Sequence, residues 1–278
     1  MSITSALFTG VNGMKAQSEA MGVISNNIAN VNTTGYKAAR TLFSDLLSQN
    51  IGHNNSQVGL GTQVQKVENQ FFGGSLQTTA NVSDVALQGD NLFFAVANLT
   101  ATGGPAPVTL PAAAQLTRAG AFNLDALGNL VNPDGKNVLD DAGLGLSYNP
   151  ATFGRITGID STGKITAVDT TGTTILAPVT GSGRIGLVRV QVPTELQKGG
   201  GSLYNSSTTS GTPLVYANLA GAGLSPTEKI VANSLESSNV DMAAEMVNMI
   251  VTQRAYSANS KTITVNDQLT NDAIQMVR

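Results

Sequence analysis

The sequence predicts an α+β fold of several segments, in which long helices at the two termini bracket an all-β central domain. Apolar residues recur at helical spacing near both ends, whereas the residues between are rich in Gly, Thr, Asn and Val and are punctuated by turn signals. The chain has 278 residues, of which 41% are hydrophobic, enough to bury a substantial core. The terminal helices are expected to pack as a coiled-coil-like pair.

The first predicted helix begins near Leu7, with apolar residues following in steps of three, four or seven. Met14, Met21 and Ile28 are spaced by strict heptads, which favours packing on another helix at a shallow crossing angle. The second helix is predicted from Asn239 to Arg278, a stretch without Pro or Gly. Polar residues such as Ser18 and Ser260 interrupt both stripes. Such a seam is weak for a lone helix pair, so either a core supports it or many copies share the burial.

An asparagine-rich run, SNNIANVN, lies at the end of the first helix. Asn26, Asn27 and Asn30 flank the apolar stripe, because a helix turns by about 100° per residue. Amides on this flank provide directional hydrogen bonds to a neighbour, or they form a solvated polar face. Asn32 to Gly35 then supply short polar side chains and a residue able to take positive φ, as at a helix C-terminus.

Two hairpins and one further strand are predicted in the centre. Residues 154–168 (GRITGIDSTGKITAV) and residues 130–139 (LVNPDGKNVL) each indicate two strands around a turn. Residues 184–193 alternate apolar with polar, as a half-buried strand does. Residues 98–116 are expected to form a surface loop, and residues 197–211 an extended connection leaving the β-domain.

These observations divide the chain into three parts. The terminal helical domain is predicted to comprise residues 1–35 and 236–278, the connecting segments residues 36–75 and 205–235, and the β-rich domain residues 76–204.

Composition excludes several classes of function. The formal net charge is −3, and no basic cluster interleaves with aromatics, so neither nucleic acid nor an anionic membrane is favoured. No apolar run approaches the roughly 18 residues of a membrane span, and any export is expected without a cleaved signal peptide. Charged residues make up only 12%, so partners are expected to cover part of the surface.

Catalytic and metal chemistry has little support in the sequence. There is no cysteine, and the single histidine, His53, lies in a polar, loop-like window, which argues against a metal site or a nucleophile–histidine relay. The glycines at 199–201 lack the lysine of a phosphate-binding loop. No enzymatic activity, cofactor or metal is therefore expected.

Two long motifs, in this order, resemble the bacterial flagellar rod and hook protein family. They are SNNIANVNTTGYK near the N-terminus and residues 234–263, SLESSNVDMAAEMVNMIVTQRAYSANSKTI. Residues 73–96 are similar to the family's entry into its β-domain, except that Asp90, Asn91 and Leu92 precede the aromatic pair Phe93 and Phe94. Among the family's members, the chain most resembles the hook protein in the short segment 43–64. Its length also fits the distal rod protein.

The resemblance implies a structural subunit that polymerises with copies of itself into the tubular flagellar hook, which transmits torque and encloses the export channel. The distal rod of the basal body is the alternative. The terminal helices would form the inner tube. Neighbouring rod, hook-junction and hook-cap proteins and the flagellar type III export apparatus are the further implied partners. An extracellular binding module with oligomerising helices is the rival from another class.

The residues expected at the assembly interface are the apolar stripes and the flanking amides. They are Leu7, Val11, Met14, Met21, Asn26, Asn27, Ile28, Asn30, Val31, Met246, Met249, Tyr256, Ile263, Ile274 and Val277. Gly35 and Tyr36 are expected to form the linker turn.

Overall fold

The computed structural model describes residues 3–47, 49–50, 57–98, 114–172, 175–176, 178, 182–211, 214–216 and 228–276. The chain forms two compact units. The helical unit consists of residues 1–31, 38–70 and 240–278, and the β unit of residues 32–37 and 71–239. The chain therefore passes between the units after residues 31, 37, 70 and 239.

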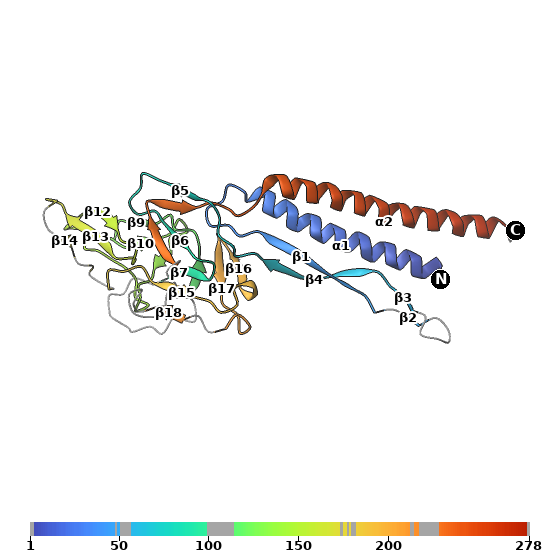
Figure 1. Cartoon of the computed structure of the whole chain (residues 1–278), viewed down its shortest axis with the longest axis horizontal. Coiled ribbons are helices and arrows are strands. Elements are labelled where there is room, and N and C mark those ends of the chain that lie inside the picture. The colour runs from blue at the N-terminus through green and yellow to red at the C-terminus, as the bar shows by residue number, and fades with distance from the viewer. Residues whose placement is uncertain are drawn as a thin grey trace. The chain divides into compact units, whose positions relative to one another are not determined.

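The secondary structure confirms the predicted α+β class, with helices near both termini and strands between (Figure 1). The elements are α1 (Ile3–Ala29), β1 (Ala39–Asp45), β2 (Gln49–Asn50), β3 (Gln57–Val58), β4 (Thr62–Asn69), β5 (Leu76–Thr78), β6 (Val85–Gln88), β7 (Leu92–Ala97), β8 (Gln115–Thr117), β9 (Asn123–Leu124), β10 (Leu130–Val131), β11 (Asn137–Val138), β12 (Phe153–Ile159), β13 (Ile165–Asp169), β14 (Ile175–Leu176), β15 (Leu187–Arg189), the 3-10 turn η1 (Pro193–Glu195), β16 (Gln197–Gly200), β17 (Leu203–Asn205), β18 (Leu214–Tyr216), β19 (Lys229–Ala232), β20 (Ser234–Glu236) and α2 (Met242–Met276).

The two helices of the helical unit run antiparallel and side by side (Figure 1). A Cβ atom built on Gly10 would lie 3.0 Å from Cγ1 of Ile263, and one on Gly13 would lie 2.6 Å from Nδ2 of Asn259. The helix α2 begins after Asp241, whose Oδ1 accepts the backbone N–H of Ala243 at 2.9 Å, as an N-cap does.

A long antiparallel hairpin, β1 paired with β4, completes the helical unit. Its register shifts between Leu42 and Phe43, which is a bulge. The hairpin contacts α1, since Nδ2 of Asn12 donates to the carbonyl of Leu60 at 3.3 Å. The segment expected to be an extended connection, residues 36–75, thus contributes two paired strands to this unit.

The β unit is built around β7. Its sequence, LFFAVA, is apolar throughout, as a strand buried on both faces should be. The strand pairs with β8, β11 and β15 in a sheet that runs β16-β17-β8-β7-β11-β10-β9, with β18 joined to β15. Smaller pairs, β19 with β6 and β20 with β5, bring the segment before α2 into the same unit.

Alternate residues of β7 face two separate hydrophobic cores. Leu92, Phe94 and Val96 belong to one core, in which the Phe94 and Phe122 rings meet edge to face at 5.1 Å between centroids. Phe93 belongs to the other core, where its ring and that of Phe71 are 5.3 Å apart. The two faces of β7 therefore line two different cores.

Both predicted hairpins are confirmed, as β12 with β13 and as β10 with β11. The prediction for residues 184–193 is half wrong: this segment contains β15, but Leu187 and Val188 are both fully buried, because the two faces of β15 enter the two hydrophobic cores. The connection expected at residues 197–211 was also wrong, because β16 and β17 are hydrogen-bonded into the large sheet.

Three predicted features fall wholly or mainly outside the described residues. They are most of the surface loop at 98–116, His53 and Val277.

Candidate assembly interface

The buried side of α1 is lined by small residues. These are Gly10, Gly13, Ala16, Ala20 and Asn27, at the three- and four-residue spacing of one helix face. The absence of a side chain at Gly10 and Gly13 brings the α1 backbone close to α2. Met14, Met21 and Ile28, the heptad predicted to form the seam, are partly buried, whereas the fully buried positions of α1 carry small residues.

The facing side of α2 is largely polar. Thr252 is the one described α2 residue that is buried. The partly buried α2 residues at helical spacing are Glu245, Met249, Ala255, Asn259, Ile263, Asn266 and Thr270. The helix pair thus buries little apolar surface, and so gains little from the hydrophobic effect.

Most of the large apolar side chains of the two helices lie away from this contact. Of the predicted interface residues, Val11 is 47% exposed, Met246 56% and Ile274 60%. Tyr256 is also exposed, and the partly buried ones are Leu7, Met14, Met21, Ile28, Val31, Met249 and Ile263. The sequence analysis missed further exposed apolar residues, namely Phe8, Met242, Val247, Ile250, Val251, Val265, Leu269 and Met276. Most of them lie on other helix faces, which a single stripe per helix does not include; Met242 continues the α2 stripe by one turn toward the N-terminus.

A shallow depression lies beside the helix contact. Val11, Met14, Ser18 and Tyr256 line it, together with Lys15 and Glu19. It therefore combines predicted interface residues of both helices with charged residues at its border.

The asparagine run divides into two roles. Asn27 is buried, its Nδ2 donates to the carbonyl of Ala39 at 2.7 Å and to Oε1 of Glu245 at 2.9 Å, and its Oδ1 accepts the N–H of Ala39 at 3.0 Å. This amide binds β1 as a neighbouring strand would, and it also reaches α2. In contrast, Nδ2 of Asn30 donates to the carbonyl of Asn26 at 2.9 Å, one turn earlier on the same helix.

The predicted linker turn belongs to the β unit. Gly35 has φ +67, and a Cβ atom on it would lie 2.5 Å from the backbone nitrogen of Ala119, so both its conformation and its surroundings require glycine. Tyr36 is buried, and the Lys198 ammonium lies 4.5 Å from the centre of its ring.

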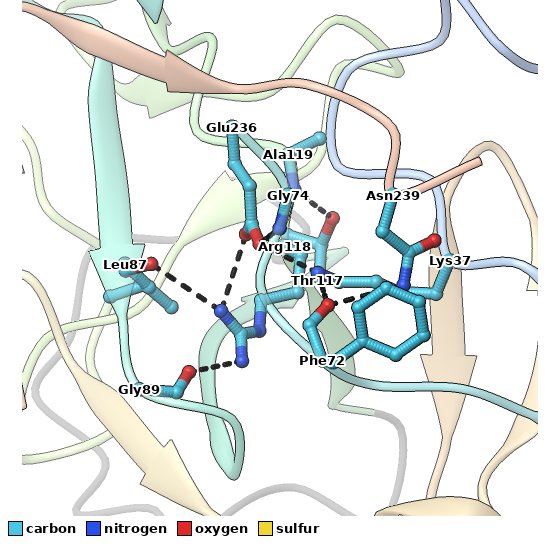
Figure 2. A network of polar contacts seen from close by, with 10 residues as sticks. All are labelled: Lys37, Phe72, Gly74, Leu87, Gly89, Thr117, Arg118, Ala119, Glu236 and Asn239. Carbon is cyan, nitrogen blue, oxygen red and sulfur yellow. Dashed lines mark hydrogen bonds and ion pairs between the residues drawn. The ribbon is translucent and has the colours of Figure 1, made fainter. Parts of the chain in front are cut away.

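A buried ionic network follows this turn (Figure 2). The Glu236 carboxylate accepts from Nζ of Lys37 at 2.6 Å, from the N–H of Gly74 at 3.0 Å and from Nη1 of Arg118 at 3.2 Å. All three ionic side chains are 0–1% exposed. Burial lowers the pKa of Lys37 and that of Arg118 from their ordinary values, against the opposing attraction of Glu236.

The two cations of this network also donate hydrogen bonds to backbone carbonyls. Lys37 also donates to the carbonyl of Phe72 at 2.8 Å, and Arg118 to those of Leu87 and Gly89. Sequence spacing did not predict this ionic network, because Lys37, Arg118 and Glu236 are far apart in the sequence. The one available signal was that Lys37 directly follows the predicted turn.

No group of three or more possible metal ligands occurs among the described residues. In the same part of the chain, no helix has the length and apolar character needed to cross a membrane.

These features are typical of a structural protein. The β unit has its own hydrophobic cores, and the helices expose large apolar side chains. Comparison with known proteins identifies the family. Residues 7–37 match the family described as flagella basal body rod protein, and residues 231–276 match the flagellar basal body rod FlgEFG protein C-terminal family.

Relatives that align over nearly their full length are also flagellar proteins. The flagellar basal-body rod protein FlgG of Bacillus subtilis is 36% identical over 98% of this chain and 99% of its own length. FlgG of Agrobacterium fabrum is 35% identical over 95% of this chain and 96% of its own. The flagellar hook protein FlgE of Treponema pallidum is 40% identical, but over 46% of this chain and 27% of its own length.

This chain belongs to the flagellar basal-body rod and hook protein family. It is a structural component of the flagellum, in a family of structural proteins. The expectation that the hook protein is its nearest likeness is not supported, since the relatives matched over their full length are named rod proteins.

Proposed function

We propose that this chain is a subunit of the distal rod, which polymerises with copies of itself into a tube around the export channel. The terminal helices form the inner tube and transmit torque through their contacts with neighbouring copies. Rod and hook-junction proteins adjoin the polymer. Subunits reach it through the flagellar type III export apparatus without a cleaved signal peptide.

The observation that carries this proposal is the arrangement of side chains on the helix pair. Small residues, Gly10 and Gly13 among them, make the contact within the subunit, whereas large apolar residues such as Met246 and Ile250 are exposed. Exposed apolar surface of this extent marks an interface. Contacts between different faces of neighbouring copies give a filament of indefinite length when the rotation between copies does not close into a ring.

The rod is favoured over the hook by the names and coverage of the relatives. The Bacillus subtilis rod protein aligns over 99% of its length, whereas the Treponema pallidum hook protein aligns over 27%. The hook remains the second candidate because that partial match is 40% identical to this chain. Immunogold labelling of isolated basal bodies separates the two: label on the rod is expected, and label confined to the hook would favour the second candidate.

Limited trypsin digestion tests the polymer itself. Lys15, Arg254 and Lys261 are exposed on the helices. Because the helix pair is weakly packed in the monomer, its ends should open readily and be cut first. In the assembled state these sites should become protected, since opening must then break contacts between subunits.

The β unit supplies the matched controls. Arg155 and Lys164 are exposed on or beside the β12–β13 hairpin, and their cleavage should not depend on assembly. Lys37 and Arg118 are fully buried and should resist in both states. Equal resistance of the helical sites at every protein concentration would contradict the proposal. A closed oligomer in electron micrographs, in place of filaments, would favour a binding module.

A further inference from the structure

Residues of the buried ionic network lie close in sequence to the points at which the chain enters or leaves the β unit. Gly35 and Lys37 belong to the short segment between the first two passages. Phe72 and Gly74 directly follow the third passage, and Glu236 and Asn239 directly precede the fourth. Figure 2 shows Lys37, Gly74 and Glu236 converging from these separate segments.

We propose that Glu236 is an anchoring residue, whose carboxylate fastens these three connecting segments to one another and to the sheet through Arg118. Both carboxylate oxygens are used, Oε1 by Lys37 and Gly74 and Oε2 by Arg118. The backbone takes part as well, since the carbonyl of Glu236 accepts the N–H of Gly35 at 2.8 Å. Three segments distant in sequence thus meet at one residue.

Arg118 supplies the fixed end of the anchor. It follows β8, and its guanidinium lies 5.3 Å from the centre of the Phe93 ring in the core. Its guanidinium also donates to the carbonyl of Leu87 in β6 and to that of Gly89 in the turn that follows β6. The carboxylate of Glu236 is therefore held to the most deeply buried part of the sheet.

Phe72 provides a second junction between the same segments. Its carbonyl accepts from Nζ of Lys37 at 2.8 Å and from Nδ2 of Asn239 at 3.1 Å. The residues beside the second, third and fourth passages are thereby linked without Glu236. This separate link allows the contribution of Lys37 to be measured apart from that of the carboxylate.

The ionic character makes the anchor specific. The carboxylate is the one negative charge within salt-bridge distance of either buried cation among the described residues. Removing it leaves two buried cations without a counterion, which is far more unfavourable than losing an exposed pair. Arrangements of the connecting segments that separate Glu236 from the two cations are unfavourable for the same reason. That the anchor also carries torque between the units rests on the proposed function; the anchoring itself does not.

Hydrogen exchange of the full-length monomer, followed by mass spectrometry, tests the anchor. In E236Q, amides of residues 32–37, 71–75 and 234–239 should exchange on the order of 100-fold faster, because local opening no longer breaks a buried ion pair. Amides of β7 and β15 should remain protected. The matched control is E228Q, which removes the partly exposed pair of Glu228 with Arg189 in the same unit and should leave the three segments unchanged.

A second variant covers the case in which E236Q does not fold. K37M keeps the pair of Glu236 with Arg118 and removes only the cation of the first connecting segment. Exchange should rise roughly tenfold at residues 32–37 and 71–75, and less at 234–239. Unchanged exchange in these segments, or an equal rise throughout β7 and β15, would overturn the proposal. Because the readout uses monomer, a failure of polymerisation would leave this result intact.

Discussion

The helical unit and the β unit bury different kinds of side chain. In the helical unit, the helices meet through glycine, alanine, threonine and asparagine, and large apolar residues such as Val247 and Ile250 are exposed. In the β unit, aromatic and aliphatic residues fill two cores on either side of β7, and the buried charges of Lys37, Arg118 and Glu236 are paired. The β unit is thus stabilised by its own core, whereas the helices retain apolar surface for neighbours.

This difference explains how one chain can serve both as a folded monomer and as a polymer subunit. A helix pair with a large apolar seam would bury most of its apolar side chains within one subunit. It would then leave little apolar surface for contacts with other copies. Small residues at the seam give close contact without using the larger side chains. Four sets of substitutions or truncations test this difference between the two units, in order of decreasing expected effect.

Removal of residues 269–278 should abolish polymerisation and leave the β unit folded. Since Gly10 lies against Ile263 and the helices are antiparallel, α2 continues past the first described residue of α1 beyond about residue 270. Ile274 and Met276 are exposed there and free to contact a neighbouring copy. Sedimentation measures assembly, and near-ultraviolet circular dichroism of the β unit is the control. Filaments of normal length from the truncated chain would contradict the expectation.

Substitution of Asn27 by alanine should destabilise the helical unit by about 2 kcal/mol, because it leaves the N–H and C=O of Ala39 buried without that partner. The matched variant N30A removes an amide whose Nδ2 donates to Asn26, one turn earlier on the same helix, and should change stability by less than about 0.5 kcal/mol. Exchange at the Ala39 amide reports the difference directly. Equal effects of the two variants would show that Asn27 has no special role.

Substitution of Gly13 by leucine should push α2 away and cost roughly 1–3 kcal/mol in the helical unit, since a side chain there meets Asn259. Gly22 provides the opposite test within the same helix, because a Cβ atom on it meets nothing within 4 Å. G22A should therefore stabilise α1 by up to about 1 kcal/mol through helix propensity. Thermal unfolding at 222 nm distinguishes the two, and a stabilising G13L would refute close packing at this site.

Alkaline pH should weaken the β unit through Tyr148, the smallest effect expected. Burial raises the pKa of Tyr148 to about 12, and its hydroxyl has no hydrogen-bond partner within the described part of the chain. The folded state retains this proton more tightly, so the associated stability is complete below about pH 10 and is lost as the pH rises through 12. By pH 11 the loss should be about 1 kcal/mol.

The variant Y148F isolates this contribution. It should remove that part of the alkaline loss and, at neutral pH, stabilise the β unit by about 1 kcal/mol, because no unsatisfied hydroxyl is then buried. Denaturant unfolding at pH 7 and pH 11 measures both. An identical pH dependence in the two proteins would exclude Tyr148 as the titrating group.

The sequence predicted the helices and hairpins because their signals are local. Periodic apolar residues identify a helix, and Asp-Gly turns identify a hairpin such as that around Gly135. Which face of a helix meets its partner was not predictable in this way, since Gly10 and Gly13 are invisible to a search for apolar stripes. The strands β16 and β17 were missed for a similar reason, because Gly199 and Gly200 indicate turns.

The ionic network could not be predicted from spacing at all. Lys37, Arg118 and Glu236 are separated by about a hundred residues, and only the tertiary fold brings them together. Asn27 likewise could not be distinguished from Asn26 and Asn30, because its role depends on the position of the Ala39 backbone. Long-range polar contacts leave little trace in a single sequence.

The alternation of β7 has a practical consequence for spectroscopy. Phe93 and Phe94 are consecutive in the chain, yet their rings lie in separate cores. A fluorine label on each would share the same backbone and report on different surroundings. During denaturation, the two resonances would show whether both halves of the β unit melt together or one after the other.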